Sequence, residues 1–534
     1  MGDYLFANGD VITMEGPGIT YPACAVRDGR ILAVGDRSRL KGLLSSNHTE
    51  IDLGGGALTP GFTDCHLHFV LSAYFRMNLD LVGVKSVVEL QKVLRDKAAK
   101  VPDGAWLMGL RFREDDYAEG RMPTVDELDQ AAPGHPVVLI RYDGHTALVN
   151  SLAMKAAGIT ESTPDPAGGV IGRDKGLLTG LLQEKAMELI MEVVPIPDGE
   201  TFMEGQRLFS RALLSQGVTG YHNVLMTSDN GPSGALGPFE VPLYKMFEPE
   251  LPFYHYPLVA ADTVEAALGI LTEHFGAEKK DGRWQGGALK LFSDGTFGSR
   301  TAYFSEDYHD RPGERGYLVN TMDWLRDMIF EAHQEGLQTA VHAIGDAAIE
   351  GLADIHLEAR ERFGDKGLRH RLEHASLIRP EVADRIRRAG LVMSFQPTFI
   401  LSEAPWIANR VGDRLDWVYP VRRMLDQGTT CCGGSDSPIE EPRVMAGVWG
   451  VTVRQGFTSQ QAVSPYEALA LYTSNAAYAS FQEDERGTII SGRRADLTVL
   501  NKNPLTVPVE ELKAIQVNMT MVNGEIAYQR GVDA

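Results

Sequence analysis

Two histidines, His66 and His68, occupy positions i and i+2 of a segment with the pattern of a β-strand, Gly-Phe-Thr-Asp-Cys-His-Leu-His at 61–68. Alternate side chains of a strand point to the same face, so both imidazoles can bind one metal ion. Isolated pairs of this kind also occur as ordinary buried or surface histidines. The pair is therefore a candidate metal site that needs further ligands elsewhere in the chain.

Residues of the metal-ligand type also stand near the ends of other expected strands. His342, His374 and Asp436 each lie where a short apolar run gives way to a loop. The carboxyl ends of barrel strands meet at one rim, so these side chains are expected to converge with the first two histidines. Imidazole and carboxylate ligands around open coordination positions are typical of hydrolytic metal sites. The pattern predicts a site that activates water.

Lys290 lies in the run Ala-Leu-Lys-Leu-Phe at 288–292, where strand alternation places it inside a barrel. An unpaired buried ammonium is costly, so it must be neutralised, paired or modified. A desolvated lysine loses its proton more readily and can then form a carbamate with CO₂, which would bridge two metal ions. The alternative is an ion pair with Asp294 or another acid.

The strands that must position these residues alternate with helical stretches, which is the pattern of β/α units in a parallel sheet. Eight segments have this pattern, as a (β/α)₈ barrel requires. They end near 63–68, 219–223, 257–260, 289–294, 340–343, 372–375, 393–396 and 432–436. We therefore predict an α/β fold built on a TIM-type barrel.

Short β-like runs separated by Gly-rich turns occupy both ends of the chain. Residues 1–58 and 485–534 are predicted to pair into one small β domain, which leaves 59–484 for the barrel. The interval 70–210 is too long for a simple loop and is predicted to be an inserted subdomain after the first strand. Residues 399–420 are rich in aromatic side chains and form a candidate lid.

Composition excludes several classes of function. The chain of 534 residues has a formal net charge of −21 and no long Lys/Arg run, which argues against nucleic-acid binding. We find no signal-peptide pattern and no apolar stretch near the roughly 20 residues that span a bilayer. The 4 cysteines show no disulfide framework. We expect a cytoplasmic protein that acts on a small molecule, without nucleic-acid or membrane partners; the oligomeric state stays open and includes a homo-oligomer.

The ordered set HxH, Lys, His, His and Asp resembles the amidohydrolase superfamily of metal-dependent hydrolases. Within it, the segments 290–302 (KLFSDGTFGSRTA), 341–347 (VHAIGDA), 371–376 (RLEHAS) and 143–145 (DGH) resemble the branch that includes N-substituted formamide deformylases. The resemblance covers nearly the whole chain. It implies a distorted (β/α)₈ barrel flanked by a small β-sandwich built from both chain ends.

The resemblance also implies a ligand set. His66 and His68 would bind the more buried ion. Lys290, as a carbamate, would bridge the two ions, and His342 and His374 would bind the second ion. Asp436 would bind metal and water. The cofactor is then a divalent metal, zinc before others, with one or two ions per chain, because some members of the superfamily use a single ion.

The reaction we expect is hydrolysis of a carbon–nitrogen bond in a small molecule such as an N-acyl or N-formyl amine. A divalent cation lowers the pKa of bound water to about 7 and polarises the substrate carbonyl. Asp436 would act as general base toward the water and then as general acid toward the departing nitrogen. His145 and His222 are expected to contact the substrate, with a structural role as the alternative for each.

Other functions stay open. One is a deaminase or another hydrolase on the same scaffold. Deaminases typically have a glutamate beside the histidine of the fifth strand, whereas 342–346 is His-Ala-Ile-Gly-Asp. A catalytically silent metal-binding relative would have an incomplete ligand set, and none of the expected ligands is missing.

Three smaller expectations concern neighbours of the site. Asp294 and Arg300 are expected to form an ion pair. Cys65 should point away from the metal, and Cys431 and Cys432 should be buried and inert.

Overall fold

The computed structural model describes residues 2–114, 117–141, 146–166, 168–195, 197–229, 232–280 and 282–532. The chain forms two compact units, one made of Met1–Leu71 and Ser210–Ala534 and the other of Ser72–Phe209. The first contains the barrel and a sheet from both chain ends, and the second contains an inserted sheet. Within the described ranges, no helix is both long and apolar enough to cross a membrane.

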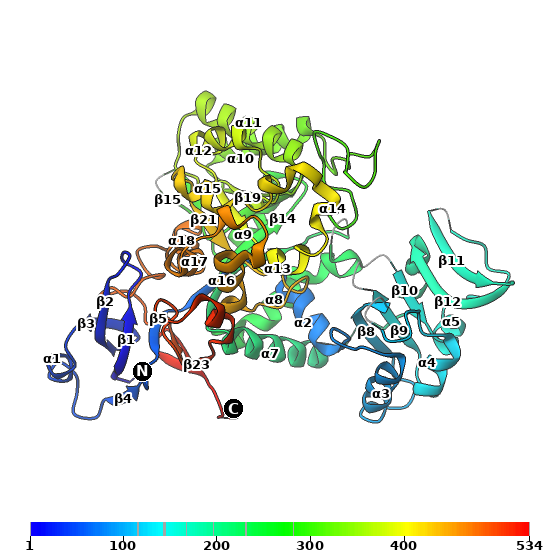
Figure 1. Cartoon of the computed structure of the whole chain (residues 1–534), viewed down its shortest axis with the longest axis horizontal. Coiled ribbons are helices and arrows are strands. Elements are labelled where there is room, and N and C mark those ends of the chain that lie inside the picture. The colour runs from blue at the N-terminus through cyan, green and yellow to red at the C-terminus, as the bar shows by residue number, and fades with distance from the viewer. Residues whose placement is uncertain are drawn as a thin grey trace. The chain divides into compact units, whose positions relative to one another are not determined.

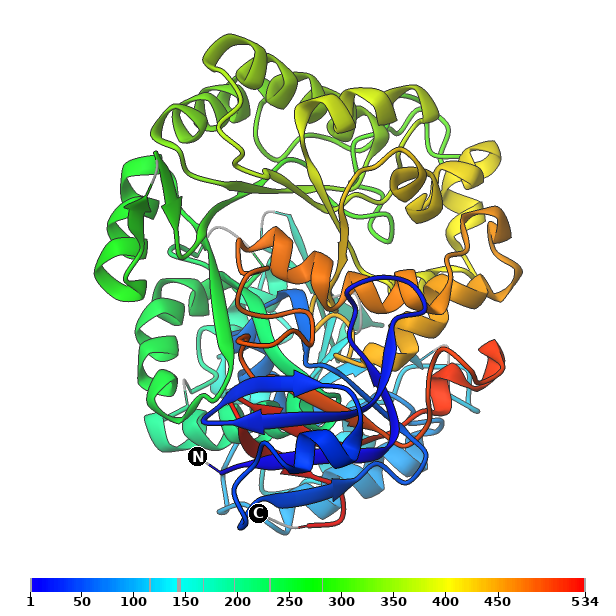
Figure 2. The same ribbon diagram turned by 90° about the vertical axis from the view of Figure 1, so that its left-hand side faces the viewer.

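Eight parallel strands form the barrel, and their order around it follows the sequence (Figures 1 and 2). They are β6 (Phe62–Leu67), β13 (Val218–Leu225), β14 (Tyr254–Ala260), β17 (Ala288–Phe292), β18 (Thr339–Ala343), β19 (Arg371–His374), β20 (Val392–Phe395) and β21 (Cys431–Gly433). Most of their residues are buried on both faces, as expected of parallel strands covered by helices. The predicted barrel is confirmed.

The first and last strands come together at their carboxyl ends, where the barrel is nearly closed. Leu67 forms a parallel bridge with Ser437, and the backbone N–H of His68 donates to the carbonyl of Ser437 at 2.8 Å. A Cβ added to Gly434 would lie 2.5 Å from the backbone nitrogen of His66. Only glycine therefore lets the chain after β21 pass this close to β6.

Asp64 strengthens the same junction. Its Oδ1 accepts the backbone N–H of His66 at 3.1 Å and that of Ser435 at 3.0 Å. One buried carboxylate thus joins the segment that carries the HxH pair to the segment that carries Asp436.

Helices connect the barrel strands, and several have clear end signals. The side chain of Thr263 accepts the N–H of Ala266 at the start of α9, and Gly276, with φ of 64°, ends that helix. The connecting helices are α8 (Glu240–Phe247), α9 (Val264–Phe275), α10 (Met322–Glu335), α11 (Asp346–Phe363), α12 (Ala383–Ala389), α13 (Phe399–Glu403), α14 (Ile407–Val411) and α15 (Val421–Asp426). After β21 come α16 (Val444–Val453), α17 (Pro465–Leu471) and α18 (Ser474–Ala479).

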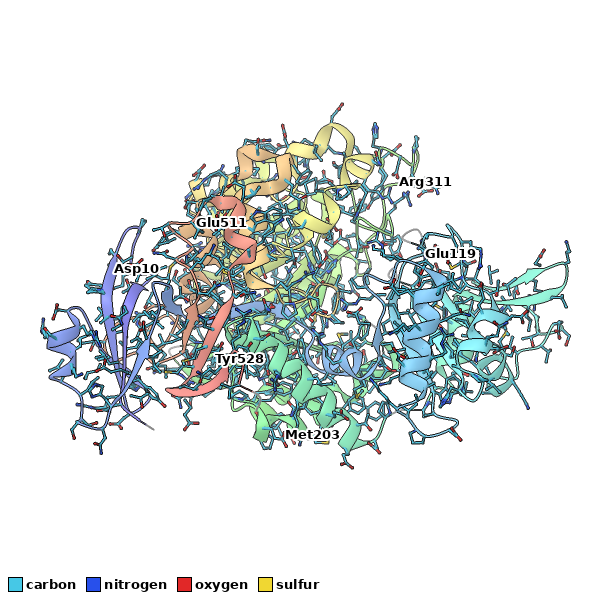
Figure 3. The ribbon with its side chains drawn as sticks, turned by 60° about the horizontal axis from the view of Figure 1, so that its bottom comes forward. Asp10, Glu119, Met203, Arg311, Glu511 and Tyr528 are labelled. Carbon is cyan, nitrogen blue, oxygen red and sulfur yellow. The ribbon has the colours of Figure 1, made fainter. Side chains whose placement is uncertain are left out.

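A mixed eight-stranded sheet contains strands from both ends of the chain, which lie side by side in blue and red in Figure 2. Its order is β24-β23-β22-β5-β1-β2-β3, with β4 paired to β1. The strands are β1 (Tyr4–Ile12), β2 (Thr20–Arg27), β3 (Arg30–Val34), β4 (Thr49–Asp52), β5 (Ala57–Pro60), β22 (Leu497–Leu500), β23 (Val517–Val522) and β24 (Glu525–Gln529), with α1 at Arg37–Lys41. Asp10, labelled in Figure 3, accepts a hydrogen bond from Asn503 at 2.7 Å, so side chains also link the two ends.

The second unit contains the inserted sheet, of order β11-β12-β10-β9-β8-β7. Its strands are β7 (Leu79–Asp80), β8 (Leu107–Phe112), β9 (Val137–Arg141), β10 (Thr146–Val149), β11 (Gly169–Asp174) and β12 (Leu177–Glu184). The helices of this interval are α2 (Phe69–Met77), α3 (Val87–Ala98), α4 (Val125–Ala131), α5 (Ser151–Ala156), α6 (Glu188–Met191) and α7 (Gly199–Ser215). This sheet confirms the predicted inserted subdomain after the first barrel strand, and the predicted bounds of 70–210 stay a prediction.

Candidate metal centre

Three buried side chains come together at the carboxyl rim of the barrel. His66 lies near the end of β6, His68 directly follows that strand, and Asp436 follows β21. Each offers one ligand atom, and these atoms lie within 4.8 Å of one another. Oδ1 of Asp436 lies 3.5 Å from Nε2 of His66 and 3.3 Å from Nε2 of His68. Two imidazole nitrogens and one carboxylate oxygen facing a common point are a suitable donor set for a divalent cation.

Two further histidines extend this group. The ring of His374, at the end of β19, lies 4.9 Å from that of His66 and 4.5 Å from that of His342 on β18, measured between ring centres. The ring of His68 lies 5.8 Å from His66 on the other side. The four predicted histidine ligands therefore form one continuous row across three strands.

Two of the expected ligands have left-handed backbone conformations. The φ angle is 68° at His374 and 58° at Asp436. A non-glycine residue in this region costs of order 1–3 kcal/mol, so the surrounding structure must hold it there. At His374 this conformation interrupts strand alternation, which explains how both Glu373 and its neighbour His374 lie beside His66.

Lys290 is inside the barrel, as predicted, and its side chain is almost completely buried. Its Nζ donates to the carbonyl of Leu291 at 3.3 Å and lies 4.2 Å from the centre of the Phe292 ring. Burial lowers the pKa of Lys290 to about 8, although Glu373 and Asp436 oppose this shift. Among the described residues no carboxylate forms an ion pair with this ammonium.

The expected ion pair between Asp294 and Arg300 is wrong. Asp294 accepts backbone N–H groups of Tyr303, Ile344 and Gly345 at 2.8–3.1 Å, which fixes the loops after β17 and β18. It is therefore engaged with backbone rather than paired with Lys290 or Arg300.

Arg300 instead forms its ion pair with Asp310, and Nη2 of Arg300 lies 2.8 Å from Oδ2 of Asp310. Arg410 of α14 contacts the same carboxylate. The loop after β17 and the candidate lid at 399–420 are thus joined through one aspartate. Local sequence spacing did not reveal this, because Asp310 belongs to a long irregular loop.

His222 lies on β13 and is fully buried. Its Nδ1 accepts from the guanidinium of Arg371 at 2.7 Å, and burial and Arg371 hold its pKa well below the ordinary value. The structure thus assigns His222 a protein partner, and its contact with a substrate stays a prediction. His145, the other residue expected to contact substrate, lies outside the described residues.

The cysteines near the site are buried, as expected. Cys65, Cys431 and Cys432 have no exposed surface. Burial raises the pKa of Cys65 and Cys431 well above the ordinary value, which disfavours thiolate chemistry at both.

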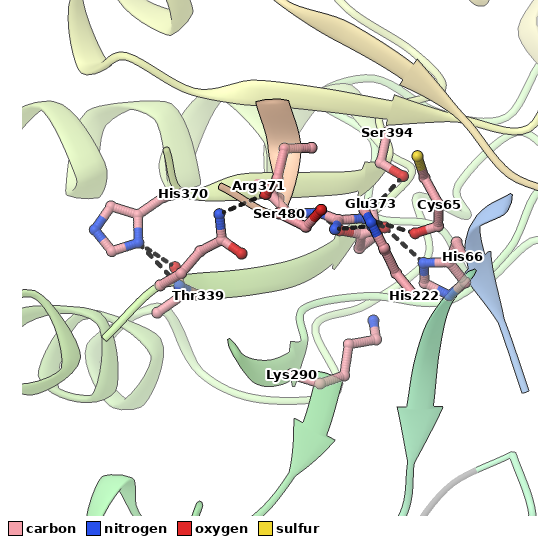
Figure 4. A network of polar contacts seen from close by, with 12 residues as sticks. Cys65, His66, His222, Lys290, Thr339, His370, Arg371, Glu373, Ser394 and Ser480 are labelled. Atoms are coloured by element: carbon pink, nitrogen blue, oxygen red, sulfur yellow. Dashed lines mark hydrogen bonds and ion pairs between the residues drawn. The ribbon is translucent and has the colours of Figure 1, made fainter. Parts of the chain in front are cut away.

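Sequence reasoning missed the polar groups that surround the ligands, which Figure 4 shows in part. Glu373 accepts from Nδ1 of His66 at 2.6 Å and from Nε of Arg371 at 2.7 Å. Oε1 of Gln396 lies 2.8 Å from Nδ1 of His374. The sequence contained a signal for this pair. Arg371 and Glu373 occupy alternate positions of one strand, so both side chains face the barrel interior, where charged residues need partners.

Comparison with known proteins identifies the family of the chain. The model of the amidohydrolase family matches residues 49–528, and the chain belongs to this family. It is 32% identical to YtcJ of Bacillus subtilis, over 98% of this chain and 99% of that protein. It is 28% identical to N-substituted formamide deformylase of Arthrobacter pascens, over 99% of both chains. The crystal structure of an uncharacterized metal-dependent hydrolase from Pyrococcus horikoshii covers 95% of this chain and 99% of its own, with 27% identity and a TM-score of 0.73.

The family and the ligand cluster together define the class of protein. The chain is a metal-dependent hydrolase of the amidohydrolase family, with a candidate metal site at His66, His68 and Asp436.

Proposed function

We propose that this hydrolase cleaves the carbon–nitrogen bond of a small N-acyl amine, with N-formyl amines as the first class to test. The observation that carries the proposal is the meeting of His66, His68 and Asp436 at the barrel rim, beside His342 and His374. The full-length similarity to N-substituted formamide deformylase supports the choice of substrate class.

The donor atoms fit one or two divalent cations, with zinc proposed first. Nδ1 of His66 and of His374 each has a protein acceptor, which leaves Nε2 of both rings as a cation ligand. Nε2 of His342 lies 3.1 Å from the carbonyl of Gly295, which leaves its Nδ1. When bound, the cation lowers the pKa of water to about 7 and polarises the carbonyl of the substrate.

Asp436 is proposed as the group that moves the proton. Burial favours its neutral form, but the hydrogen bond with His68 and the nearby His66 outweigh burial and lower its pKa, so the carboxylate is ionised and can accept a proton. In the proposal it takes the proton of the attacking water and delivers it to the nitrogen of the leaving amine.

Lys290 is proposed to carry a carbamate that bridges two cations. Its amine is buried beside the histidine row and has no carboxylate partner among the described residues. A carbamate would replace a buried ammonium by an anion that two cations neutralise, which removes the cost of the unpaired charge.

Two phenylalanines support an apolar substituent on the substrate nitrogen. The ring of Phe399, the first residue of α13, is parallel to that of His374 within 6°, with centres 6.4 Å apart. Phe292 lies 6.1 Å from His342 by the same measure. We propose that these rings flank the substrate and favour N-benzyl or N-alkyl groups over charged ones.

The proposal is tested by metal analysis together with a substrate panel. The panel contains N-benzylformamide, N-benzylacetamide, a cyclic amide and an aminopurine as a deaminase substrate. We expect metal-dependent release of amine from the formamide, faster than from the other three. Deamination of the aminopurine as the fastest reaction, or no turnover of any amide by the metal-loaded protein, would contradict the proposal.

A further inference from the structure

A pair of opposite charges lies behind the metal-ligand row, inside the barrel. Arg371 and Glu373 are both fully buried on β19. Nε of Arg371 donates to Oε1 of Glu373 at 2.7 Å, and Nη2 of Arg371 donates to Oε2 of Glu373 at 3.1 Å. Figure 4 shows this pair beside Ser394, Cys65 and His66. The same Oε2 lies 2.6 Å from Nδ1 of His66.

The contact with Glu373 determines the protonation of His66. A carboxylate can only accept, so Nδ1 of His66 carries a hydrogen, and in the neutral ring Nε2 then carries the lone pair. Nε2 is the atom that faces Asp436 at 3.5 Å. Glu373 therefore holds the ring in the tautomer and orientation in which its free nitrogen points to the candidate metal site.

Arg371 holds the carboxylate of Glu373 in place. Its guanidinium donates to both carboxylate oxygens, so a buried positive charge lies directly against Glu373. Arg371 is itself fixed by the carbonyl of Cys65 at 2.7 Å and by Nδ1 of His222 at 2.7 Å. The carboxylate of Glu373 is thus an acceptor for His66 that Arg371 keeps in a fixed position.

Two other histidines of the row, His374 and His68, have weaker partners. The acceptor of Nδ1 in His374 is the neutral amide oxygen of Gln396. Nδ1 of His68 is buried without a hydrogen-bond partner in the part of the chain that the structure describes. An anionic partner raises the basicity of an imidazole ligand more than a neutral one does. His66 is therefore the strongest donor of the three.

We infer that Glu373, held by Arg371, is a positioning residue that makes the His66–His68–Asp436 site the tighter of two cation sites. The inference rests on the proposed function, because it requires that these residues bind a cation. A buried ion pair is seldom more stabilising than apolar residues of similar size, so stability alone is a poor reason for this pair inside the barrel.

The experiment measures zinc binding to the full-length apo protein by competition with a chromophoric chelator, without reference to activity. For Glu373→Gln we expect 10–100-fold weaker binding of the tightest ion. Glu373→Asp retains an anionic acceptor on a shorter side chain and should recover part of the affinity. Gln396→Glu gives His374 an anionic partner and should tighten the weaker ion.

A matched control comes from another buried carboxylate–arginine pair. Asp496, next to β22, lies 3.3 Å from Arg486, and both side chains are 2% exposed. Asp496→Asn should lower the unfolding temperature and leave zinc affinity unchanged. An equal loss of affinity in Asp496→Asn and Glu373→Gln would reduce Glu373 to a structural residue and overturn the inference.

Zinc binding distinguishes failure of the proposed function from failure of the positioning role of Glu373. If the wild-type protein binds no zinc or other divalent ion, the proposed function is wrong. If the wild type binds zinc, but Glu373→Gln and Gln396→Glu both bind as the wild type does, only the positioning role of Glu373 is wrong. Unfolding of each apo variant, followed by circular dichroism, shows that the compared proteins are folded.

Discussion

Oδ1 of Asp436 lies 3.3 Å from Nε2 of His68, although the two residues belong to the last and the first strand segments of the barrel. The relationship depends on barrel closure, because Asp436 reaches the site only where the chain after β21 passes beside β6. Its backbone N–H donates to the carbonyl of His66 at 2.7 Å, which fixes that approach. The catalytic proposal therefore depends on the geometry of a single strand junction.

Asp436→Asn should lower kcat by about 10²–10⁴-fold, the range typical for loss of a general acid–base group. The amide keeps the size of the side chain but cannot take the proton from water. Steady-state kinetics with the best formamide of the panel measure the effect, and metal content is measured on the same sample. Asp384→Asn, an exposed aspartate that pairs with Arg387 on the surface, is the matched control. If Asp436→Asn had the kcat of the wild type, the proposed proton transfer by Asp436 would be wrong.

Gly434→Ala should loosen the closure of the barrel. The added Cβ would lie 2.5 Å from the His66 nitrogen and 3.0 Å from Oδ1 of Asp64, so β21 and β6 must move apart. We expect a loss of about 1–3 kcal/mol in unfolding free energy, as for other overpacked sites, together with weaker metal binding. Denaturant unfolding and metal analysis measure the two effects.

The control for that substitution is Gly269→Ala on α9. A Cβ there meets no heavy atom within 4 Å, so the exchange should be neutral or slightly stabilising. Equal behaviour of the two alanine variants would show that Gly434 is not needed for the approach of β21 to β6.

Stability should fall in mild acid because of a buried histidine away from the site. Nε2 of His356 lies 3.0 Å from the hydroxyl of Thr339, and its Nδ1 lies 2.8 Å from the carbonyl of Leu352. Burial lowers the pKa of His356 from 6.5 to about 4. The folded state thus binds fewer protons than the unfolded state between these values, so this contribution is complete above pH 6.5 and is lost as pH falls toward 4.

The full shift corresponds to roughly 3 kcal/mol at 1.36 kcal/mol per pKa unit. Urea unfolding at a series of pH values measures it. His356→Gln keeps a polar side chain that does not titrate, and should reduce the slope of the pH dependence in this window. A variant with the same pH slope as the wild type would show that other groups cause the acid sensitivity.

Asp310→Asn should loosen the connection between the loop after β17 and the candidate lid. Asp310 contacts both Arg300 and Arg410, and its side chain is 22% exposed, so the stability loss should be only about 1 kcal/mol. The larger effect should be faster proteolytic cleavage within 399–420 and a higher KM. If Asp310→Asn resisted proteolysis as the wild type does, Asp310 would not be needed to hold the candidate lid in place.

The barrel was predictable from sequence because each strand is a short apolar run followed by a polar loop, and the ligand residues occur at those junctions. Lys290 was placed inside the barrel by alternation alone. Alternation fails at His374, where positive φ turns the side chain toward the site beside Glu373. The predicted ligand role of His374 came from its place at a strand end and from the order of the motifs, and not from strand alternation.

Long-range partners were not predictable. The sequence spacing of Asp294 and Arg300 suggested an ion pair, but backbone N–H groups from the loop after β18 occupy Asp294, and Asp310 takes Arg300. The contact between Glu373 and His66 joins strands that are remote in the chain. Such pairs are fixed by the register of the barrel, which sequence patterns do not specify.

The most direct test of the account is a crystal structure of the purified protein with data collected at the absorption edge of its metal. We expect an anomalous peak among His66, His68 and Asp436. If two ions are present, we expect a second peak beside His342 and His374, and a carbamate on Lys290 between them. A fully active preparation that shows no anomalous peak at this rim and is unaffected by strong chelators would contradict it.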